Sequence, residues 1–222
     1  MDLEFHFDFG SPNAYLSHLV IPEIEIRLGQ KITYQPVLLG GVFKATNNVS
    51  PAESMRGILN KPDYAQRETQ RFLEAHSITS FQQNPHFPVN TLMLMRGAVF
   101  AQSTDYFERY LNEVYHHMWS APKKLDDPDT FHAALIESGL PADEIFTGIQ
   151  QPEVKARLIA NTEDSVARGN FGSPSFFAGA EMFFGKDKLE AFEAYIAAQA
   201  YATGKVLIVR SQLRIWIKRP AC

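Results

Sequence analysis

The sequence predicts an α/β protein in which a βαβ unit and a ββα unit are separated by a large all-helical insertion. Apolar and polar residues alternate over residues 3–9 and again over 31–37, with a helical pattern between them. Alternation with a period of two residues is typical of strands. The spacing of apolar residues is helical from about 50 to 169. Two short strand patterns then follow within 175–184, and an amphipathic helix is predicted over 186–199.

The first strand runs directly into a helix through a tight turn. Its odd positions are aliphatic or aromatic, whereas its even positions from 4 to 8 are polar. Gly10 ends the strand, Ser11 is a good helix N-cap, and Pro12 suits the first helical position because its missing N–H is not needed there. The N-terminus of a helix has free N–H groups and a partial positive charge, so this turn favours a bound anion.

The order of the other elements completes the predicted fold. The second strand, at 31–37, is expected to pair parallel to the first through a right-handed crossover. Residues 38–44 then leave the sheet along a tight path, because they contain Gly40 and Gly41. Within the helical block, 84–88 reads as a rigid break, because it holds two prolines.

These patterns divide the chain into three parts. Residues 1–46 and 170–200 form one predicted α/β domain, and 47–169 form a helical insertion domain. Residues 201–222 are basic and contain strand-like runs, and we assign no function to this tail.

Composition limits the class of protein. Of the 222 residues, 45% are hydrophobic and 21% are charged, as in ordinary globular proteins, and the net charge of −4 does not favour nucleic-acid binding. No apolar run reaches the roughly 18 residues that span a bilayer, so no membrane partner is expected. The N-terminus lacks the pattern of a secretory signal, and we therefore expect a cytoplasmic protein.

The chain contains a single cysteine, Cys222. This count excludes an intramolecular disulfide, a cysteine-rich metal site and a two-cysteine redox centre, and with them a disulfide oxidoreductase. His116 and His117 are adjacent and so lie on different faces of a helix, and we predict no metal site.

Three segments together resemble one family. Residues 7–15 (Phe-Asp-Phe-Gly-Ser-Pro-Asn-Ala-Tyr) resemble the opening of 2-hydroxychromene-2-carboxylate isomerases and of kappa-class glutathione transferases. Residues 40–48 are similar to the segment after their second strand, and 171–177 resemble their cis-proline loop, followed by 184–189. The resemblance covers about residues 2–199 and implies a thioredoxin-like fold of the DsbA type with a helical insertion.

The resemblance implies that the reactive sulfur belongs to bound glutathione and that Ser11 is the catalytic residue that hydrogen-bonds to it. Lowering a thiol pKa from about 8.5 by roughly two units requires about 2.7 kcal/mol. A helix N-terminus contributes about 0.3–1 kcal/mol, and a hydrogen bond to a charged acceptor roughly 1.5–3 kcal/mol. Ser11 and its helix can therefore supply the shift. The alternative is that Ser11 is only an N-cap.

Other residues are assigned to glutathione by the same resemblance. Pro174 is expected in cis, so that the Ser173 backbone pairs with the cysteinyl part of glutathione like an added strand. Lys186 and Asp187 match positions that hold the γ-glutamyl end. The alternatives are an ordinary trans proline at a strand start and an aspartate that only caps the last helix.

Further positions are expected to bind carboxylates or the substrate. Asn48 and Arg56 are assigned to the glycine carboxylate of glutathione or to the organic acid. Lys44 is assigned to the substrate carboxylate, with a solvated loop lysine as the alternative. Asn84 and Pro85 belong to a segment that resembles one lining the substrate cleft, and its alternative is a helix-breaking linker.

The function implied is a glutathione-dependent cis–trans isomerase, a homodimer in aromatic degradation. It would convert 2-hydroxychromene-2-carboxylate-type acids to trans-o-hydroxybenzylidenepyruvate-type products. Phe43 occupies the slot of the isomerase lysine, and Glu53-Ser54 stand where some isomerases show Asn-Arg, so the substrate stays open. The alternatives are a kappa-class-like glutathione transferase and a non-catalytic thioredoxin-fold binding protein.

Overall fold

The computed structural model describes residues 1–202, so the predicted tail lies outside the described residues from 203 onward. The elements follow in the order β1 (Leu3–Phe7), α1 (Pro12–Leu28), β2 (Thr33–Pro36), α2 (Leu39–Thr46), α3 (Pro51–Ser54), α4 (Lys61–Ala75), α5 (Leu92–Ala101), α6 (Phe107–Trp119), α7 (Pro128–Glu137), α8 (Ala142–Gly148), α9 (Pro152–Ala167), β3 (Ser175–Ala178), β4 (Glu181–Phe184), the short 3₁₀ helix η1 (Lys186–Lys188) and α10 (Leu189–Ala202).

The four strands form one mixed sheet in the order β2-β1-β3-β4. β1 pairs parallel to β2 and antiparallel to β3, and β3 pairs antiparallel to β4. In the register of the sheet, Phe5 lies between Tyr34 on β2 and Phe176 on β3. The predicted βαβ and ββα units are thus confirmed, and the antiparallel pairing of β1 with β3 joins them into one sheet.

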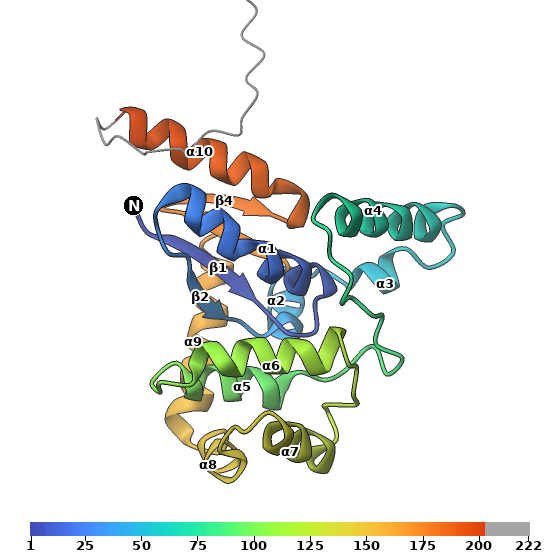
Figure 1. Ribbon diagram of the computed structural model, residues 1–222, viewed down its shortest axis with the longest axis vertical. Coiled ribbons are helices and arrows are strands. Elements are labelled where there is room, and N and C mark those ends of the chain that lie inside the picture. Colours follow the sequence, from blue (N-terminus) through green and yellow to red (C-terminus); the bar gives the residue numbers. More distant parts are fainter. Residues whose placement is uncertain (203–222) are drawn as a thin grey trace, which may run out of the picture.

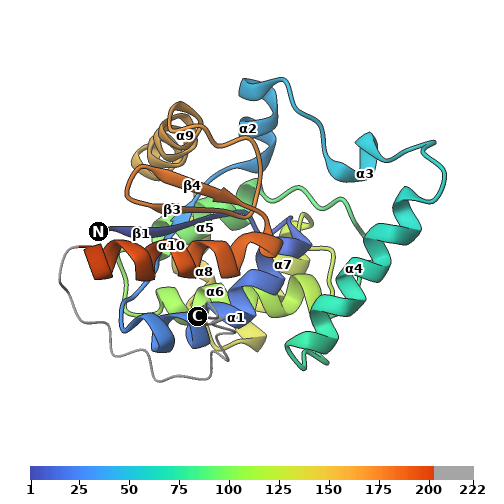
Figure 2. The same cartoon turned by 90° about the horizontal axis from the view of Figure 1, so that it is seen from above.

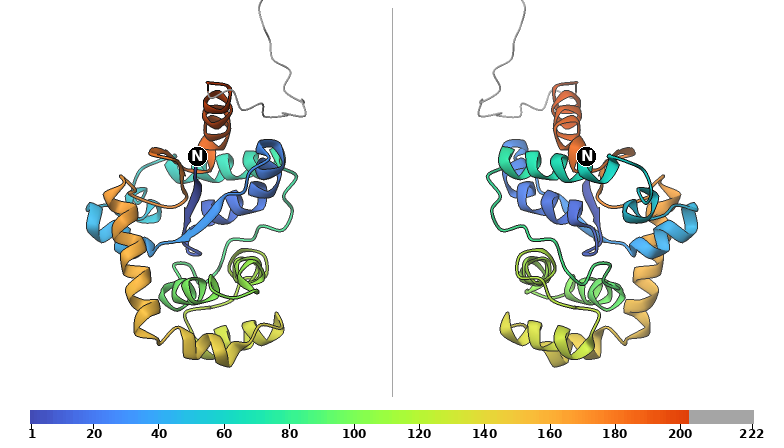
Figure 3. Two further views of the ribbon diagram at one scale, coloured as in Figure 1. Left: turned by 90° about the vertical axis from the view of Figure 1, so that its left-hand side faces the viewer. Right: turned by 90° about the vertical axis from the view of Figure 1, so that its right-hand side faces the viewer.

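Helices cover both faces of the sheet (Figures 1 and 2). α1 and α10 pack against each other on one face, and α9 lies on the opposite face beside α2. Helices α5 to α8 form a block beyond β2, and α3 and α4 project to one side of the molecule (Figures 1 and 3). No helix among the described residues has both the length and the apolar character needed to cross a membrane.

The two faces of β1 bury different kinds of side chain, aromatic on one face and polar on the other. Phe5 stacks on Phe176, with the ring centroids 5.0 Å apart, and Phe176 contacts Phe192 of α10. On the other face the imidazole of His6 is fully buried and hydrogen-bonds to Ser165 of α9. The polar positions of the strand therefore face a helix, and each buried polar group has a hydrogen-bond partner there, as burial demands.

Residues 38–44 were predicted only to leave the sheet, and the structure shows that most of them belong to helix α2. The buried carboxylate of Asp8 accepts the Leu39 N–H at 2.7 Å and so satisfies a donor at the start of this helix. Gly41 allows α9 to approach, because a Cβ at this position would lie 3.1 Å from the methyl group of Thr162. Tertiary contacts thus stabilise a helix that a Gly-Gly pair disfavours.

The predicted break before α5 is confirmed. Residues 84–88 belong to no helix or strand, and the Phe87–Pro88 peptide is cis. The predicted long helix or pair of helices at 89–118 is a pair, α5 and α6. Tyr110 of α6 lies against Gly97 of α5 and donates to the Leu94 carbonyl at 2.8 Å, which fixes the two helices side by side.

Candidate functional site

Ser11 lies at the start of α1, as the strand-turn-helix pattern predicted. Its Oγ accepts the Ala14 N–H at 3.2 Å, which is the N-cap interaction. The same hydroxyl donates to the carbonyl oxygen of Ser173 at 2.8 Å. The Ser11 side chain therefore connects the positive end of the helix to the proline loop, and the residue is only 5% exposed.

The proline loop has the conformation that the resemblance implied. The Ser173–Pro174 peptide is cis. The Ser173 hydroxyl accepts the Asp8 N–H at 3.2 Å, and the Pro174 carbonyl accepts the Gly185 N–H at 2.9 Å. The loop is thus fixed between the end of β1 and the segment that precedes η1.

Asp8 lies buried beneath this turn. Its carboxylate accepts the Gly10 N–H at 2.8 Å and the Leu39 N–H at 2.7 Å, and burial raises the pKa of this carboxyl although these two bonds oppose the change. Asp8 therefore holds the turn before Ser11 against the start of α2. The signal in the sequence was an acidic residue between two phenylalanines, the second of which directly precedes the glycine that ends the strand pattern.

The helical block holds the other side of the same turn. The indole Nε1–H of Trp119, at the end of α6, donates to the Phe9 carbonyl at 2.7 Å. The Phe9 N–H lies 3.5 Å from the sulfur of Met95 on α5. These long-range contacts fix the backbone that precedes Ser11.

Asn170 shapes the proline loop from the interior. Its Oδ1 accepts the Gly172 N–H at 2.9 Å and the Ser175 hydroxyl at 2.7 Å. Its Nδ2 donates to Ser165 Oγ at 2.7 Å, and Ser165 Oγ is also 2.7 Å from His6 Nδ1. One buried amide therefore joins the loop to α9 and β1.

This network ends in an ion pair between Glu4 of β1 and Arg168, the residue that follows α9. Arg168 binds both carboxylate oxygens of Glu4, at 2.8 and 3.0 Å, and His6 Nε2 lies 2.8 Å from the same carboxylate. Burial opposes ionisation of Glu4, but hydrogen bonds from Arg168 and His6 outweigh it and lower the pKa of Glu4. Burial lowers the pKa of His6 although the Glu4 carboxylate opposes the change, so the environment beside Ser165 favours the neutral imidazole.

Lys186 and Asp187 lie next to the proline loop, since Gly185 bonds to Pro174. Lys186 is 5% exposed, and its Nζ is 2.6 Å from Asp187 Oδ1 and 5.0 Å from the centre of the Phe72 ring of α4. A buried ammonium over an aromatic face is a favourable cation–π arrangement. Asp187 is exposed and therefore accessible to a ligand amine.

Asn48 reaches the same loop from the end of α2, because its Nδ2 donates to the Phe171 carbonyl at 2.9 Å. The predicted glutathione residues other than Arg56, namely Ser11, Asn48, Ser173, Pro174, Lys186 and Asp187, are thus connected by a chain of contacts around one loop.

The residues assigned to the substrate do not form one connected group with Ser11 in the described part of the chain. Asn84 is 2% exposed. Its amide donates to the Met118 and Lys123 carbonyls and accepts the His86 N–H, so these contacts use the side chain to hold the backbone. Pro85 is exposed, and Arg56 is exposed after α3. No contact within the described residues joins these three side chains to Ser11, and their role in binding stays a prediction.

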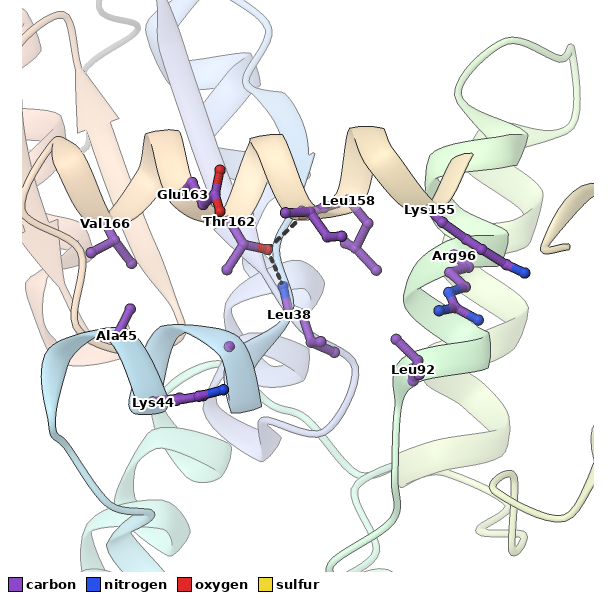
Figure 4. A pocket seen from close by; sticks show the side chains of 12 residues that line it. Leu38, Lys44, Ala45, Leu92, Arg96, Lys155, Leu158, Thr162, Glu163 and Val166 are labelled. Atoms are coloured by element: carbon purple, nitrogen blue, oxygen red, sulfur yellow. Dashed lines mark hydrogen bonds between the residues drawn. The ribbon is translucent and has the colours of Figure 1, made fainter. Parts of the chain in front are cut away.

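Lys44 lines a cavity of about 340 Å³ between α2, α5 and α9 (Figure 4). Ser11 does not line this cavity. Two other cationic residues do, Arg96 and Lys155, and sequence analysis missed both. Neither lies near a recognisable motif, so only the tertiary structure brings them together.

The sheet order, the cis proline and the capped helix opposite it define the thioredoxin class of fold, here with a serine at the start of the helix. The chain belongs to the DSBA-like thioredoxin domain family, whose family model matches residues 2–197. The predicted fold is thereby confirmed.

The chain is also similar to proteins that are named as enzymes. The chain is 24% identical over 196 residues to the 2-hydroxychromene-2-carboxylate isomerase of Sphingobium xenophagum, covering 87% of this chain and 97% of the relative. It is 24% identical over 212 residues to glutathione S-transferase kappa 1 of Rattus norvegicus, covering 90% and 92%. A solved 2-hydroxychromene-2-carboxylate isomerase superposes with a TM-score of 0.78 at 24% identity, covering 92% of this chain and 98% of that one. The recognised resemblance is thus confirmed, and these relatives are named as enzymes.

Proposed function

We propose that the protein is a glutathione-dependent isomerase that acts on 2-hydroxychromene-2-carboxylate-type acids. Relatives named for this isomerase reaction support the proposal. The observation that carries it is the Ser11 hydroxyl, which lies at the positive end of α1 and 2.8 Å from the carbonyl of Ser173. The only cysteine is residue 222, so in this proposal the sulfur at Ser11 must come from the ligand.

The hydrogen bond between Ser11 and Ser173 fits an exchange of partners on binding. A serine hydroxyl has one proton, which here points at the Ser173 carbonyl. When the glutathione thiolate docks, the hydroxyl turns to donate to the sulfur. The Ser173 carbonyl then accepts the cysteinyl N–H of glutathione, so neither protein group loses a partner. This exchange makes Ser11 a donor to an anion, which is a stronger hydrogen bond than the one it replaces.

The reaction is nucleophilic catalysis with a borrowed nucleophile. The thiolate adds to the conjugated carbon of the substrate, a carbon–sulfur bond forms, and the ring opens. The former double bond is now single and rotates. It re-forms in trans geometry as the carbon–sulfur bond breaks and the thiolate leaves. The thiolate is regenerated, so glutathione is not consumed.

The remaining assignments follow the charges of the groups. Asp187 takes the γ-glutamyl amine of glutathione, and Lys186 with nearby helix N–H groups takes its carboxylate. Asn48 binds toward the glycine end. Lys44 supplies the positive charge for the substrate carboxylate.

The test is turnover of 2-hydroxychromene-2-carboxylate by purified protein, with and without glutathione. We expect turnover only with glutathione, and a large loss in Ser11→Ala. Ser17→Ala is the matched control, because Ser17 is in the same helix and its hydroxyl donates only to the Asn13 carbonyl, at 2.9 Å. Turnover that ignores glutathione, or that survives Ser11→Ala undiminished, would contradict the proposal.

A second candidate function is a kappa-class-like glutathione transferase, which the relative from Rattus norvegicus favours. The same thiolate would then displace a leaving group from the electrophile and stay attached to it. Conjugation of glutathione to 1-chloro-2,4-dinitrobenzene, with no isomerisation of the chromene acid, would support this function. A calorimetric titration that shows no glutathione binding would exclude both enzymes and favour a non-catalytic binding protein.

A further inference from the structure

The cavity lined by Lys44 lies between α2, α5 and α9 (Figure 4). Its volume of about 340 Å³ lies within the range of small-molecule sites, roughly 300–1,000 Å³. The cavity and the Ser11 turn share a wall, because Leu39 follows the cavity residue Leu38 and binds Asp8 beneath that turn. Neither Ser11 nor Ser173 lines the cavity.

Apolar side chains form most of the cavity. Leu38 directly precedes α2, and Ala45 lies on α2. Leu92 lies on α5, and Leu158 and Val166 lie on α9. The polar side chain of Thr162 is already engaged, because its hydroxyl accepts the Leu38 N–H at 3.0 Å and donates to the Leu158 carbonyl at 2.7 Å. The walls therefore suit an apolar molecule.

Three cations and one carboxylate surround these apolar walls. Figure 4 shows Lys44 on the α2 side and Arg96 and Lys155 on the α5 side. Glu163 is the only acidic residue of the lining. Among residues 1–202 neither Lys44 nor Arg96 takes part in an ion pair, and Lys155 donates to the neutral amide of Gln150 at 3.1 Å. The positive charge is thus not neutralised by the described protein.

Arg96 carries the strongest sign of an absent partner. Its Nε atom is buried and has no hydrogen-bond partner among residues 1–202. Buried donors in native proteins are almost always paired, because an unpaired donor loses its contact with water without compensation. Guanidinium groups present a planar fork of donors that matches a carboxylate.

We propose that this cavity binds an apolar organic carboxylate, whose acid group is held by Arg96 with Lys155 and whose body lies against the leucines of α5 and α9. The carboxylate accepts from the Arg96 guanidinium on the α5 side of the cavity. This site does not depend on the proposed function, which requires glutathione at Ser11. Lys44 also lines the cavity, but it is left to the substrate of the proposed function and is not needed to hold this acid.

The test is a calorimetric titration of the full chain with 1-naphthoate, without glutathione. The matched neutral probe is naphthalene-1-carboxamide, which has the same ring system and no charge. We expect the acid to bind about tenfold or more tightly than the amide, and to bind more weakly as salt is added. Equal binding of the two probes, or no binding of the acid, would overturn the proposal.

Variants of the cavity residues test whether the acid binds in this cavity. Arg96→Gln is expected to weaken naphthoate binding about tenfold or more, since it removes a charged donor. Arg71→Gln, on exposed α4, is the control and should bind as wild type does. Ala45→Phe places a ring in the cavity from an exposed position and should also abolish binding, and melting curves check that each variant is folded. Unchanged affinity in Arg96→Gln and Ala45→Phe would overturn the assignment.

Two further titrations separate this proposal from the proposed function. Naphthoate should bind equally well to Ser11→Ala and to protein saturated with glutathione. Loss of binding in either case would place the acid next to Ser11 and overturn a separate site. If naphthoate binds as expected while no glutathione-dependent turnover is found, only the proposed function fails.

Discussion

The hydroxyl of Ser11 donates to the carbonyl oxygen of Ser173 across 2.8 Å, although the two residues are 162 positions apart in the chain. The contact joins the N-cap of α1 to the cis-proline loop. In the proposed function a thiolate inserts at this contact. The predictions below test the hydroxyl, the groups that hold it, and the packing behind it.

Ser11→Ala is expected to raise the thiol pKa of bound glutathione by roughly one to two units. A hydrogen bond to a charged acceptor contributes roughly 1.5–3 kcal/mol, and one pKa unit corresponds to about 1.4 kcal/mol. Ultraviolet titration of the thiolate in the complex measures this value. Ser17→Ala should leave it unchanged, and a thiol pKa in wild type equal to that of free glutathione would contradict a role for Ser11.

Asp8→Ala should destabilise the fold by roughly 3 kcal/mol, because it leaves the partly buried N–H groups of Gly10 and Leu39 without their acceptor. Urea denaturation measures the change in the free energy of unfolding. Asp129→Ala, an exposed position on α7, is the control and should change it by less than about 0.5 kcal/mol. Equal effects of the two substitutions would show that Asp8 does not hold the turn.

Asn170→Ala should loosen the proline loop and weaken glutathione binding while leaving the thiol pKa in the complex nearly unchanged. The substitution removes the acceptor of the Gly172 N–H and of the Ser175 hydroxyl. We expect faster hydrogen exchange at Gly172 and a loss of stability of about 2 kcal/mol. Asn161→Ala, which removes one bond to the Pro36 carbonyl, serves as the control and should not affect exchange at Gly172.

Because the pKa of the His18 imidazole is lowered in the folded protein, we expect the free energy of unfolding to depend on pH. Burial lowers this pKa from the ordinary value of 6.5 to about 4, between Tyr34 and Asn112. Between these pH values the unfolded chain binds a proton that the folded chain does not, so stability falls as the pH falls from 6.5 towards 4. The full contribution is roughly 3 kcal/mol.

The measurement is urea denaturation of wild type and His18→Gln across this pH range. Glutamine keeps a donor and an acceptor but does not titrate, so its free energy of unfolding should fall less steeply. Other titrating groups are common to both proteins and cancel in the difference. Parallel curves would show that His18 titrates normally in the folded state.

Gly97→Ala should destabilise the helical block by about 1–3 kcal/mol through overpacking. A Cβ at this position would lie 2.7 Å from Cζ of Tyr110. Gly40→Ala is the matched control, since a Cβ on that helical glycine meets nothing within 4 Å and alanine favours helix by about 1 kcal/mol. Thermal melting compares the two, and a stabilised Gly97→Ala would contradict the close contact of α5 with α6.

The sequence predicted β1 because the alternation of apolar and polar residues can be read from adjacent positions. It predicted Ser11 as an N-cap because Gly10 and Pro12, on either side of it, mark the end of a strand and the start of a helix. It did not predict helix α2, whose start depends on Asp8, a residue in another element. The resemblance placed Lys186 at the glutathione site, but its burial under Phe72 arises from a helix more than a hundred residues earlier in the chain. Arg96 and Lys155 meet only in the folded chain, so no local pattern reveals their cavity.

The pairing of Leu3 with Ala178 has a consequence for biosynthesis. β1 is made first, yet its neighbour β3 is made only after all the helices of the insertion. The nascent β1 therefore keeps one open edge until residue 178 has left the ribosome, and open edges invite pairing with other chains. Helices α5 to α8 can assemble in the meantime, and a truncated chain that ends before Ser175 should aggregate during translation.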